Sequence, residues 1–329
     1  HGGTVETALS RGLYSNGQNW IIISASDGVT GRFDGLSYQI NSETVNLKLA
    51  YNSRQVLLEI VRTPFAGFGT TPAGQAVGAG LDEVVPIADG NMASFITAMD
   101  FGMSRSQIGD TLNALSPEIY TSFSAAGLRS AGVLDQAVAQ HQAELRQGRA
   151  LGLTSLVDAN TEDHGEWTVW TRAIGNWSER DSDAGYLGYS QELSGVVAGT
   201  DRQFMNVLRA GVDLGYTNNE LEWNGTEHSG AMQGRHIGLY ASAEPGNFFF
   251  DVSASYSDFT ADANRIIAFN DLALEATSGI DSDAWTGRLE GGYTFTINSW
   301  LLSPVASREY AHLTQDGLSD HGADFLNLD

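Results

Sequence analysis

Apolar and polar residues alternate with a period of two through most of residues 166–329. One segment places Phe248, Phe250 and Val252 on one face and Asp251 on the other. This alternation predicts antiparallel strands that each have an apolar and a polar face. A soluble sandwich alternates in the same way, so the pattern alone leaves both a sandwich and a membrane barrel open.

The connections between these strands favour a membrane barrel, which has short periplasmic turns and longer external loops. Tight connections alternate with longer polar ones: 200–203, 244–247 and 296–299 are tight, and 180–187, 217–230 and 259–282 are long. Aromatic residues also stand near strand ends, as in interfacial girdles. They are Trp167, Trp177, Tyr189, Phe204, Tyr216, Phe248, Phe259, Tyr293 and Trp300. The pattern predicts seven strands and the start of an eighth at 324–328.

The first half of the chain has other periodicities. Residues 1–62 contain short alternating runs between Gly and Asn turns, which predicts a stacked β-structure. Residues 63–80 are rich in Gly, Ala, Thr and Pro and are predicted to be a linker. Apolar residues at helical spacing predict a long helical region over 81–157, in which Ser116 and Pro117 form a start signal.

The alternation of connections also gives the chain a direction. If the tight turns are periplasmic, the first strand, near 166–180, starts on the periplasmic side, and the preceding helix ends at the periplasmic mouth. A segment outside the cell can reach that point only through the lumen. A helix is about 10–12 Å across with its side chains, so small residues are favoured there. The residues predicted for this lumen helix are Ala139, Ala143, Leu145 and Arg146.

Charge and composition narrow the function. The formal net charge is −23, and Lys48 is the only lysine. So acidic a chain is an unlikely nucleic-acid partner, because phosphate binding needs clustered positive charge. Cysteine is absent, which suits a chain that crosses an oxidising periplasm unfolded, because an early disulfide would close a loop.

The candidate chemistry is sparse. His141 and Glu144 lie one helical turn apart, but two ligands make a poor metal site. The aspartate pairs at 181–185 and 281–285 do not continue into a calcium-loop spacing, and no nucleophile elbow is visible. The sequence therefore predicts no catalytic residue, metal or cofactor. Charged residues on the predicted inner faces are the functional candidates: Arg172, Arg209, Asp213, Arg288 and Glu290.

Several segments resemble monomeric autotransporters of the type V secretion pathway, in the order of that family. GLYSNGQNWIIISASDGVTGRFDGL resembles the last passenger turns, with matching residues at Tyr14, Gly28, Gly31 and Phe33. NLKLAYNSRQVLLEIVR resembles the repeat that closes the passenger, and TPAGQAVGAGLD resembles the junction. LNALSPEIYTSF is similar to the helical segment, and EWTVWTRAIGNW and GVVAGTDRQF are similar to the first two barrel strands.

The resemblance implies three parts: an autochaperone-like passenger end at 1–62, a linker and helical region at 63–165, and a β-barrel at 166–329. The family's barrel has twelve strands and ends in an aromatic residue. About seven or eight strands are therefore expected here, in a mainly β chain whose barrel is truncated. An eight-stranded barrel is filled by its own side chains and would leave no room for a helix. Arg308 departs from the pattern, because it falls on an apolar face.

The implied function is a translocator in the bacterial outer membrane that delivers its own passenger to the cell surface and is then plugged by the helix. Implied partners are outer-membrane lipids, the barrel-assembly machinery and periplasmic chaperones. Two alternatives stay open. One is a porin-like channel with a periplasmic N-terminal module, and the other is the C-terminal part of a surface enzyme whose catalytic domain lies upstream.

Overall fold

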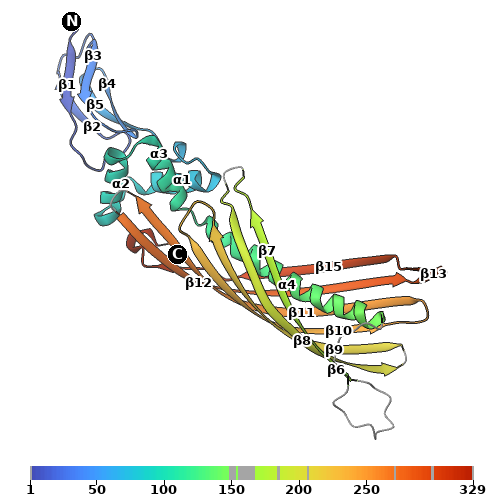
Figure 1. Ribbon diagram of the computed structural model, residues 1–329. Coiled ribbons are helices and arrows are strands. Elements are labelled where there is room, and N and C mark those ends of the chain that lie inside the picture. The colour runs from blue at the N-terminus through green and yellow to red at the C-terminus, as the bar shows by residue number, and fades with distance from the viewer. Residues whose placement is uncertain are drawn as a thin grey trace.

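Three parts follow one another along the molecule in the computed structural model: a small β-stack, a group of short helices and a large curved sheet (Figure 1). The structure describes residues 2–147, 153–154, 167–183, 186–205, 207–269, 272–297 and 300–327. No helix in these ranges is both long and apolar enough to cross a membrane.

The β-stack contains five short strands. They are β1 (Thr4–Ala8), β2 (Asn19–Ser24), β3 (Gly35–Gln39), β4 (Val45–Tyr51) and β5 (Gln55–Arg62). β1 pairs with β3 in parallel, and β5 lies between β2 and β4 in an antiparallel sheet. The stack buries Val45, Leu47, Leu58 and Ile60 against Phe101 of the following helices. The alternation in residues 45–60 predicted these strands correctly, because every second residue enters this core.

Helices fill the chain from residue 65 to residue 146. They are η1 (Phe65–Gly67), α1 (Pro72–Val84), α2 (Gly90–Gly102), α3 (Arg105–Ala114) and α4 (Glu118–Arg146). We call η1 to α3 the helical cap. Its core contains Phe95, Ile96, Met99, Ile108 and Leu112.

The linker predicted over 63–80 is wrong from residue 72 onward, because α1 begins there. The Thr71 side chain accepts a hydrogen bond from the backbone N–H of Gly74, and Pro72 occupies the first turn. The small residues have a packing reason, since a Cβ at Gly78 would overlap the backbone of Ala66. The helical region predicted over 81–157 is confirmed as far as Arg146, divided among the end of α1 and the helices α2, α3 and α4, and α4 begins directly after the start signal of Ser116 and Pro117. Residues 148–152 and 155–157 lie outside the described residues.

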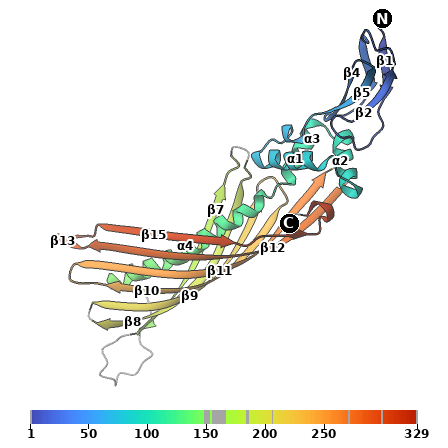
Figure 2. The ribbon, with the colours of Figure 1, turned by 180° about the vertical axis from the view of Figure 1, so that it is seen from behind.

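The large sheet is antiparallel and runs in the order β15-β12-β11-β10-β9-β8-β7-β6. Its strands are β6 (Leu153–Thr154), β7 (Trp167–Arg180), β8 (Tyr189–Met205), β9 (Leu208–Trp223), β10 (Ser229–Ala243), β11 (Phe248–Phe269), β12 (Leu272–Tyr293) and β15 (Val305–Gln315). β13 (Phe295–Ile297) and β14 (Trp300–Leu302) form a hairpin, and β16 (Asp320–His321) pairs with β12. The sheet curves around α4, which lies along its concave face (Figures 1 and 2).

The seven predicted strands are present as β7 to β12 and β15, but several connections were misplaced. Residues 217–230 and 259–282 are mostly strand, and residues 200–203 lie inside β8. The polar residues in 259–282 alternate with small buried ones such as Ala261 and Ala263, which pack against α4. A segment that looks like a polar loop is therefore a strand with a wet outer face.

The eighth strand expected at 324–328 is wrong over 324–326, where the structure has the 3₁₀ helix η2 (Asp324–Leu326). Asp324 has a φ of 54°, which a strand does not allow. Its carboxylate accepts a hydrogen bond of 2.9 Å from Asn91 of α2. Leu326 is buried in the core of the helical cap, so packing on the cap turns the chain out of the sheet.

Candidate functional site

The convex face of the sheet carries an apolar belt. Its exposed apolar residues include Val196, Phe204, Val212, Leu214, Ile237, Leu239, Phe248, Phe250, Val252, Trp285 and Leu289. On β11 the belt runs from Phe248 to Tyr256, and the next outward residue is Asp258. On β12 it runs from Trp285 to Tyr293, and Asp283 is the outward residue beyond it.

The edge of the belt lies at one level across neighbouring strands. Tyr256 is paired with Trp285 and with Ile237, whereas Asp258 is paired with Asp283 and with Arg235. Large apolar residues thus meet charged ones along a line that crosses several strands. Tyr256 and Trp285 pack ring against ring, 4.9 Å apart, at this line. An aromatic border between an apolar band and a charged surface is the signature of a membrane interface.

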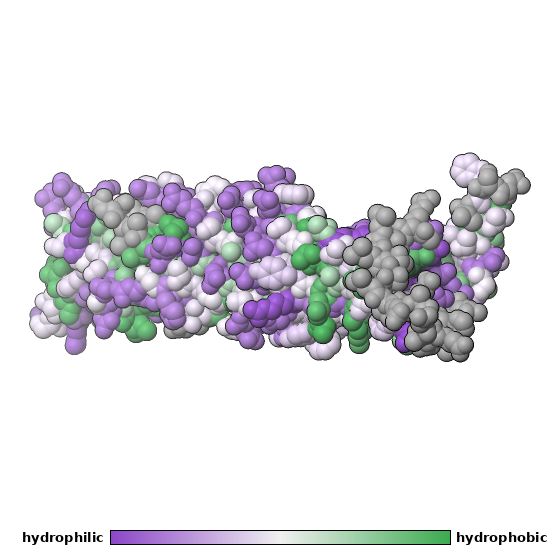
Figure 3. Space-filling model, turned by 60° about the horizontal axis from the view of Figure 1, so that its bottom comes forward, coloured by the Kyte–Doolittle hydropathy of each residue, from purple (hydrophilic) through white to green (hydrophobic). Residues whose placement is uncertain are grey.

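The width of the belt fits a bilayer. A membrane strand needs roughly 9–11 residues, and residues 248–256 and 285–293 meet this requirement. β11 and β12 continue well past Asp258 and Asp283, and the helical cap packs on the extended part of this hairpin. We call this the cap end of the sheet and the opposite one the turn end. In the space-filling view, hydrophobic and hydrophilic residues lie next to one another on the part of the molecule formed by the large sheet, on the right (Figure 3).

The concave face also changes at the edge of the belt, but there the residues change from polar within the belt to apolar beyond it. Within the belt, inward residues of β11 are polar, such as Ser253, Ser255 and Ser257, and beyond it they are Phe259, Ala261 and Ala263. The first half of α4 packs on the apolar part. This cluster, which we call the socket, contains Ile119, Tyr120, Phe123, Ala126 and Ala131 of α4 and Tyr189, Leu221, Trp223, Met232, Phe259, Ala261, Ala263, Ile280 and Ala284 of the sheet.

The second half of α4 makes polar contacts inside the belt. His141 is bonded through Nε2 to Asp201, 2.7 Å away, and its ring stacks on Trp170. Tyr240 donates a hydrogen bond of 2.9 Å to the same carboxylate. Arg209 forms an ion pair of 2.5 Å with Asp201. The buried Asp201 therefore has three hydrogen-bond partners, which compensates its loss of water.

Further pairs hold the end of the helix, and we call them the latch. The Arg172 guanidinium donates to both carboxylate oxygens of Glu144, each 2.8 Å away. Arg146 forms ion pairs with Asp251 and Glu290, and Arg288 pairs with Glu290 and Glu309. A cavity of about 500 Å³ lies beside these charges, between α4 and strands β12 and β15.

The structure places the charged candidates on the concave face. Arg172, Arg288 and Glu290 belong to the latch, and Arg209 contacts Asp201. Asp213 accepts a hydrogen bond of 3.0 Å from His236, whose other ring nitrogen contacts Ser257. The aligned Asp, His and Ser are all buried, and none of them lines a described cavity. Arg308 lies opposite Leu289 of the belt, on the outer face.

The lumen-helix candidates fall in different surroundings. Ala139 and Ala143 line the cavity, Leu145 is half-buried, and Arg146 is part of the latch. His141 and Glu144 bind different partners, and the described residues contain no cluster of three metal-ligating side chains. Sequence reasoning missed Asp201 and Tyr240 as partners of His141, although both occupy inward positions in the alternation.

Two polar groups near the cap end also have structural roles. The Arg265 guanidinium is fully buried, pairs with Asp320 at 2.5 Å and donates to the carbonyl oxygen of Leu326 at 3.0 Å. Burial and the neighbouring Arg265 keep the pKa of His228 below its ordinary value. The His228 Nδ1 atom accepts a hydrogen bond of 3.0 Å from the backbone N–H of Ile266.

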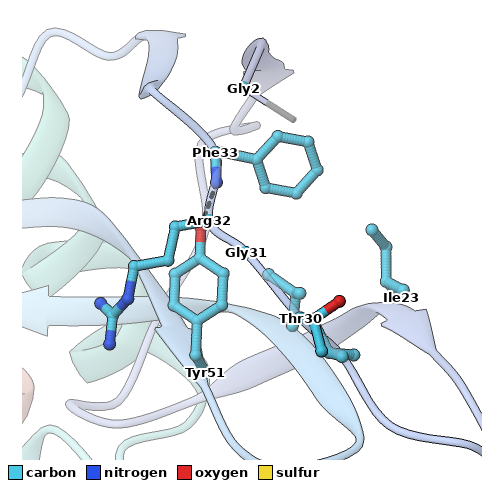
Figure 4. Close-up of a pocket in the computed structure, with 9 residues that line it drawn as sticks. Gly2, Ile23, Thr30, Gly31, Arg32, Phe33 and Tyr51 are labelled. Carbon is cyan, nitrogen blue, oxygen red and sulfur yellow. Dashed lines mark hydrogen bonds between the residues drawn. The ribbon is translucent and has the colours of Figure 1, made fainter.

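The passenger-end motif shapes the β-stack. Tyr14 packs edge-on against Phe101 of α2, 6.2 Å between ring centroids. Gly28 and Gly31 have φ values of 99° and 89°, which only glycine adopts readily. The Tyr51 hydroxyl accepts a hydrogen bond from the backbone N–H of Phe33 across a cavity of about 200 Å³ that Gly31 also lines (Figure 4).

Three comparisons relate this chain to known proteins. Residues 169–329 match the family model "Autotransporter beta-domain". The chain is 26% identical, over 98% of its length, to an extracellular serine protease of Serratia marcescens, and 25% identical over 93% to a second protein of that description. It spans only 34% and 32% of these relatives. The translocator domain of autotransporter NalP from Neisseria meningitidis matches 60% of this chain and 63% of its own, with 14% identity and a TM-score of 0.42. The match of residues 169–329 to the autotransporter beta-domain supports an autotransporter translocator in the outer membrane.

Proposed function

We propose that the translocator delivers its own passenger to the cell surface, that residues 2–62 are the end of that passenger, and that α4 then closes the pore. The observation that carries this proposal is the course of α4 along the concave face of the sheet. Glu118 at its start binds the backbone of Leu187 at the cap end, and Arg146 at its end contacts Asp251, close to the tight connection after β10.

This course supports a passenger outside the cell. The helix enters the sheet at the cap end and leaves it at the turn end, where β7 begins. The short connections of outer-membrane barrels are periplasmic, so the cap and the β-stack are on the outside. A chain that starts in the periplasm reaches this arrangement by passing through the lumen. The order of the three parts, 1–62, 63–165 and 166–329, is then the order of passenger, linker and barrel.

The barrel-assembly machinery and periplasmic chaperones are the proposed partners of insertion. A long strand with an unpaired edge and an apolar face aggregates in water unless it is covered. The strands of the large sheet carry the exposed apolar belt, so helper proteins are expected to hold the chain before it enters the membrane.

Deleting 118–146 from the full-length protein tests the plug. This deletion removes α4 together with its apolar and its charged contacts, so it should raise single-channel conductance in planar bilayers while the sheet stays folded. Changing the exposed residue Gln136 to alanine is the matched control and should leave the pore closed. An unchanged conductance after the deletion would contradict the plug.

A second proposal concerns the passenger. The two Serratia relatives are extracellular serine proteases and extend well beyond the matched region, so we propose that the passenger upstream of residue 1 is a surface serine protease. A fluorophosphonate probe should label the passenger on intact cells. An upstream gene sequence without a serine protease domain, or a passenger that stays unlabelled, would reject this proposal.

A further inference from the structure

The contacts of α4 divide into two layers of different chemistry. The socket is apolar and close-packed: Ile119, Tyr120, Phe123 and Ala126 expose at most 2% of their surface. The second half of α4 packs Leu134, Ala137 and Val138 on one part of the wall. On the side of β12 and β15 it faces the charged latch and a cavity of about 500 Å³ whose lining includes Asp135, Arg288 and Glu290. A polar space of this size holds water, whereas an apolar constriction excludes water and ions.

The two layers also differ in their position relative to the belt. Trp223 and Leu221 lie on β9 beyond Tyr216, the last outward aromatic residue of that strand, and the outward residues there are Glu220 and Glu222. Met232 lies on β10 beyond Arg235. The socket is therefore built from strand extensions that stand above the apolar belt. His141, Asp201 and the latch lie within the belt.

We propose that the permeability seal of the resting pore is the socket, above the membrane plane, and that the lumen at membrane level is wet. The proposal rests on the function proposed above, because it requires that α4 occupies the pore. In this proposal, the charged contacts of the latch hold the end of α4 in place. The aromatic contacts of the socket block the passage of ions.

Two glycines at the contact between α4 and the wall, one on each side, make the socket specific for one seating of α4. A Cβ at Gly230 would overlap the Phe123 ring, and one at Gly127 would come within 2.8 Å of Leu313. The Phe123 ring also packs on Trp223, 5.7 Å away. Since the ring fills the notch left by Gly230, a side chain at this position would displace the helix from the wall.

Substituting Gly230→Val in the full-length protein is the test. Valine suits a strand, and the variant should show a leak conductance roughly tenfold above that of the native protein, because a wetted constriction conducts. Gly287→Val is the matched control, since the nearest atom to an added Cβ there is 3.9 Å away; it should stay closed. Phe123→Ala, which empties the notch without changing the wall, should leak in the same way.

The double variant Arg172→Ala/Glu144→Ala separates the two layers. It removes a pair of the latch and leaves no unpaired partner, so the pore should stay closed. The inference would be overturned if this double variant leaked while the Gly230→Val and Phe123→Ala variants stayed closed, because the seal would then lie at membrane level. Failure of the plug itself gives a different result, since the deletion of the whole helix, 118–146, would then leave the conductance unchanged.

Discussion

Arg62 and Asp100 connect the β-stack to the helical cap. The guanidinium donates to both carboxylate oxygens, at 2.7 and 2.8 Å, and Thr44 of the stack donates to the same carboxylate at 2.5 Å. The arginine side chain is 6% exposed and the aspartate side chain is not exposed. Removing one member of a buried ion pair leaves an uncompensated charge away from water. This lowers the free energy of unfolding by about 3–5 kcal/mol.

We predict that Arg62→Ala uncouples the stack from the cap. Residues 2–62 should become sensitive to protease at lower urea concentration, with the barrel unaffected. The ion pair of Lys48 and Glu59 on β4 and β5 provides the control, because its side chains are 54% and 25% exposed. Lys48→Ala should lower the free energy of unfolding by about 0–1 kcal/mol. An equal effect of both substitutions on protease sensitivity would contradict the special role of Arg62.

Sequence reasoning could identify the inward charges but not their partners. Alternation predicts the face on which Arg172 and Glu290 lie, because the side-chain period of a strand is two. It does not predict the register between the strands and α4, which decides that Arg172 meets Glu144. Arg265 was missed altogether, since residues 259–282 read as a polar loop.

At the scale of elements, the strand pattern was predictable where the outer face is apolar. Past Asp258 on β11 and before Asp283 on β12, the outer residues become mostly polar and the inner ones mostly apolar, so the alternation inverts. A pattern search that expects one apolar face along a whole strand stops at this inversion. The start of the helical cap, η1 and most of α1, was predicted to be a linker for a different reason, because its glycines serve close packing and resemble those of a linker.

The faces of α4 give a prediction for this element. Ala137 is 3% exposed and packs near Trp170 and Tyr240, whereas Ala139 lines the cavity beside Arg288. Ala137→Trp should prevent the helix from seating, because the wall leaves no space for an indole. Ala139→Trp should be tolerated in the resting state. Trypsin digestion of the purified full-length protein measures this, and α4 should be cut in the first variant alone. Equal protection of both variants would count against the seating of Ala137 on the wall.

At the scale of the whole molecule, the order of stack, helices and sheet could be predicted, because each part has its own periodicity. The extent of the sheet above the belt could not, since it depends on contacts between β9 to β12, α4 and the cap. The result is a molecule in which one hairpin, β11 and β12, spans the belt and supports the cap.

Sidedness tests the central claim most directly, namely that the cap end faces the outside and the passenger has crossed the membrane. This chain has no cysteine, so each introduced thiol in it is unique. The variants are Asp27→Cys in the β-stack, Glu227→Cys at the cap end and Glu244→Cys at the turn end, all at exposed positions. A membrane-impermeant maleimide on intact cells should label residues 27 and 227, and residue 244 only after the outer membrane is permeabilised. Labelling of residue 244 on intact cells, with residue 27 protected as in a channel with a periplasmic N-terminal module, would contradict the account.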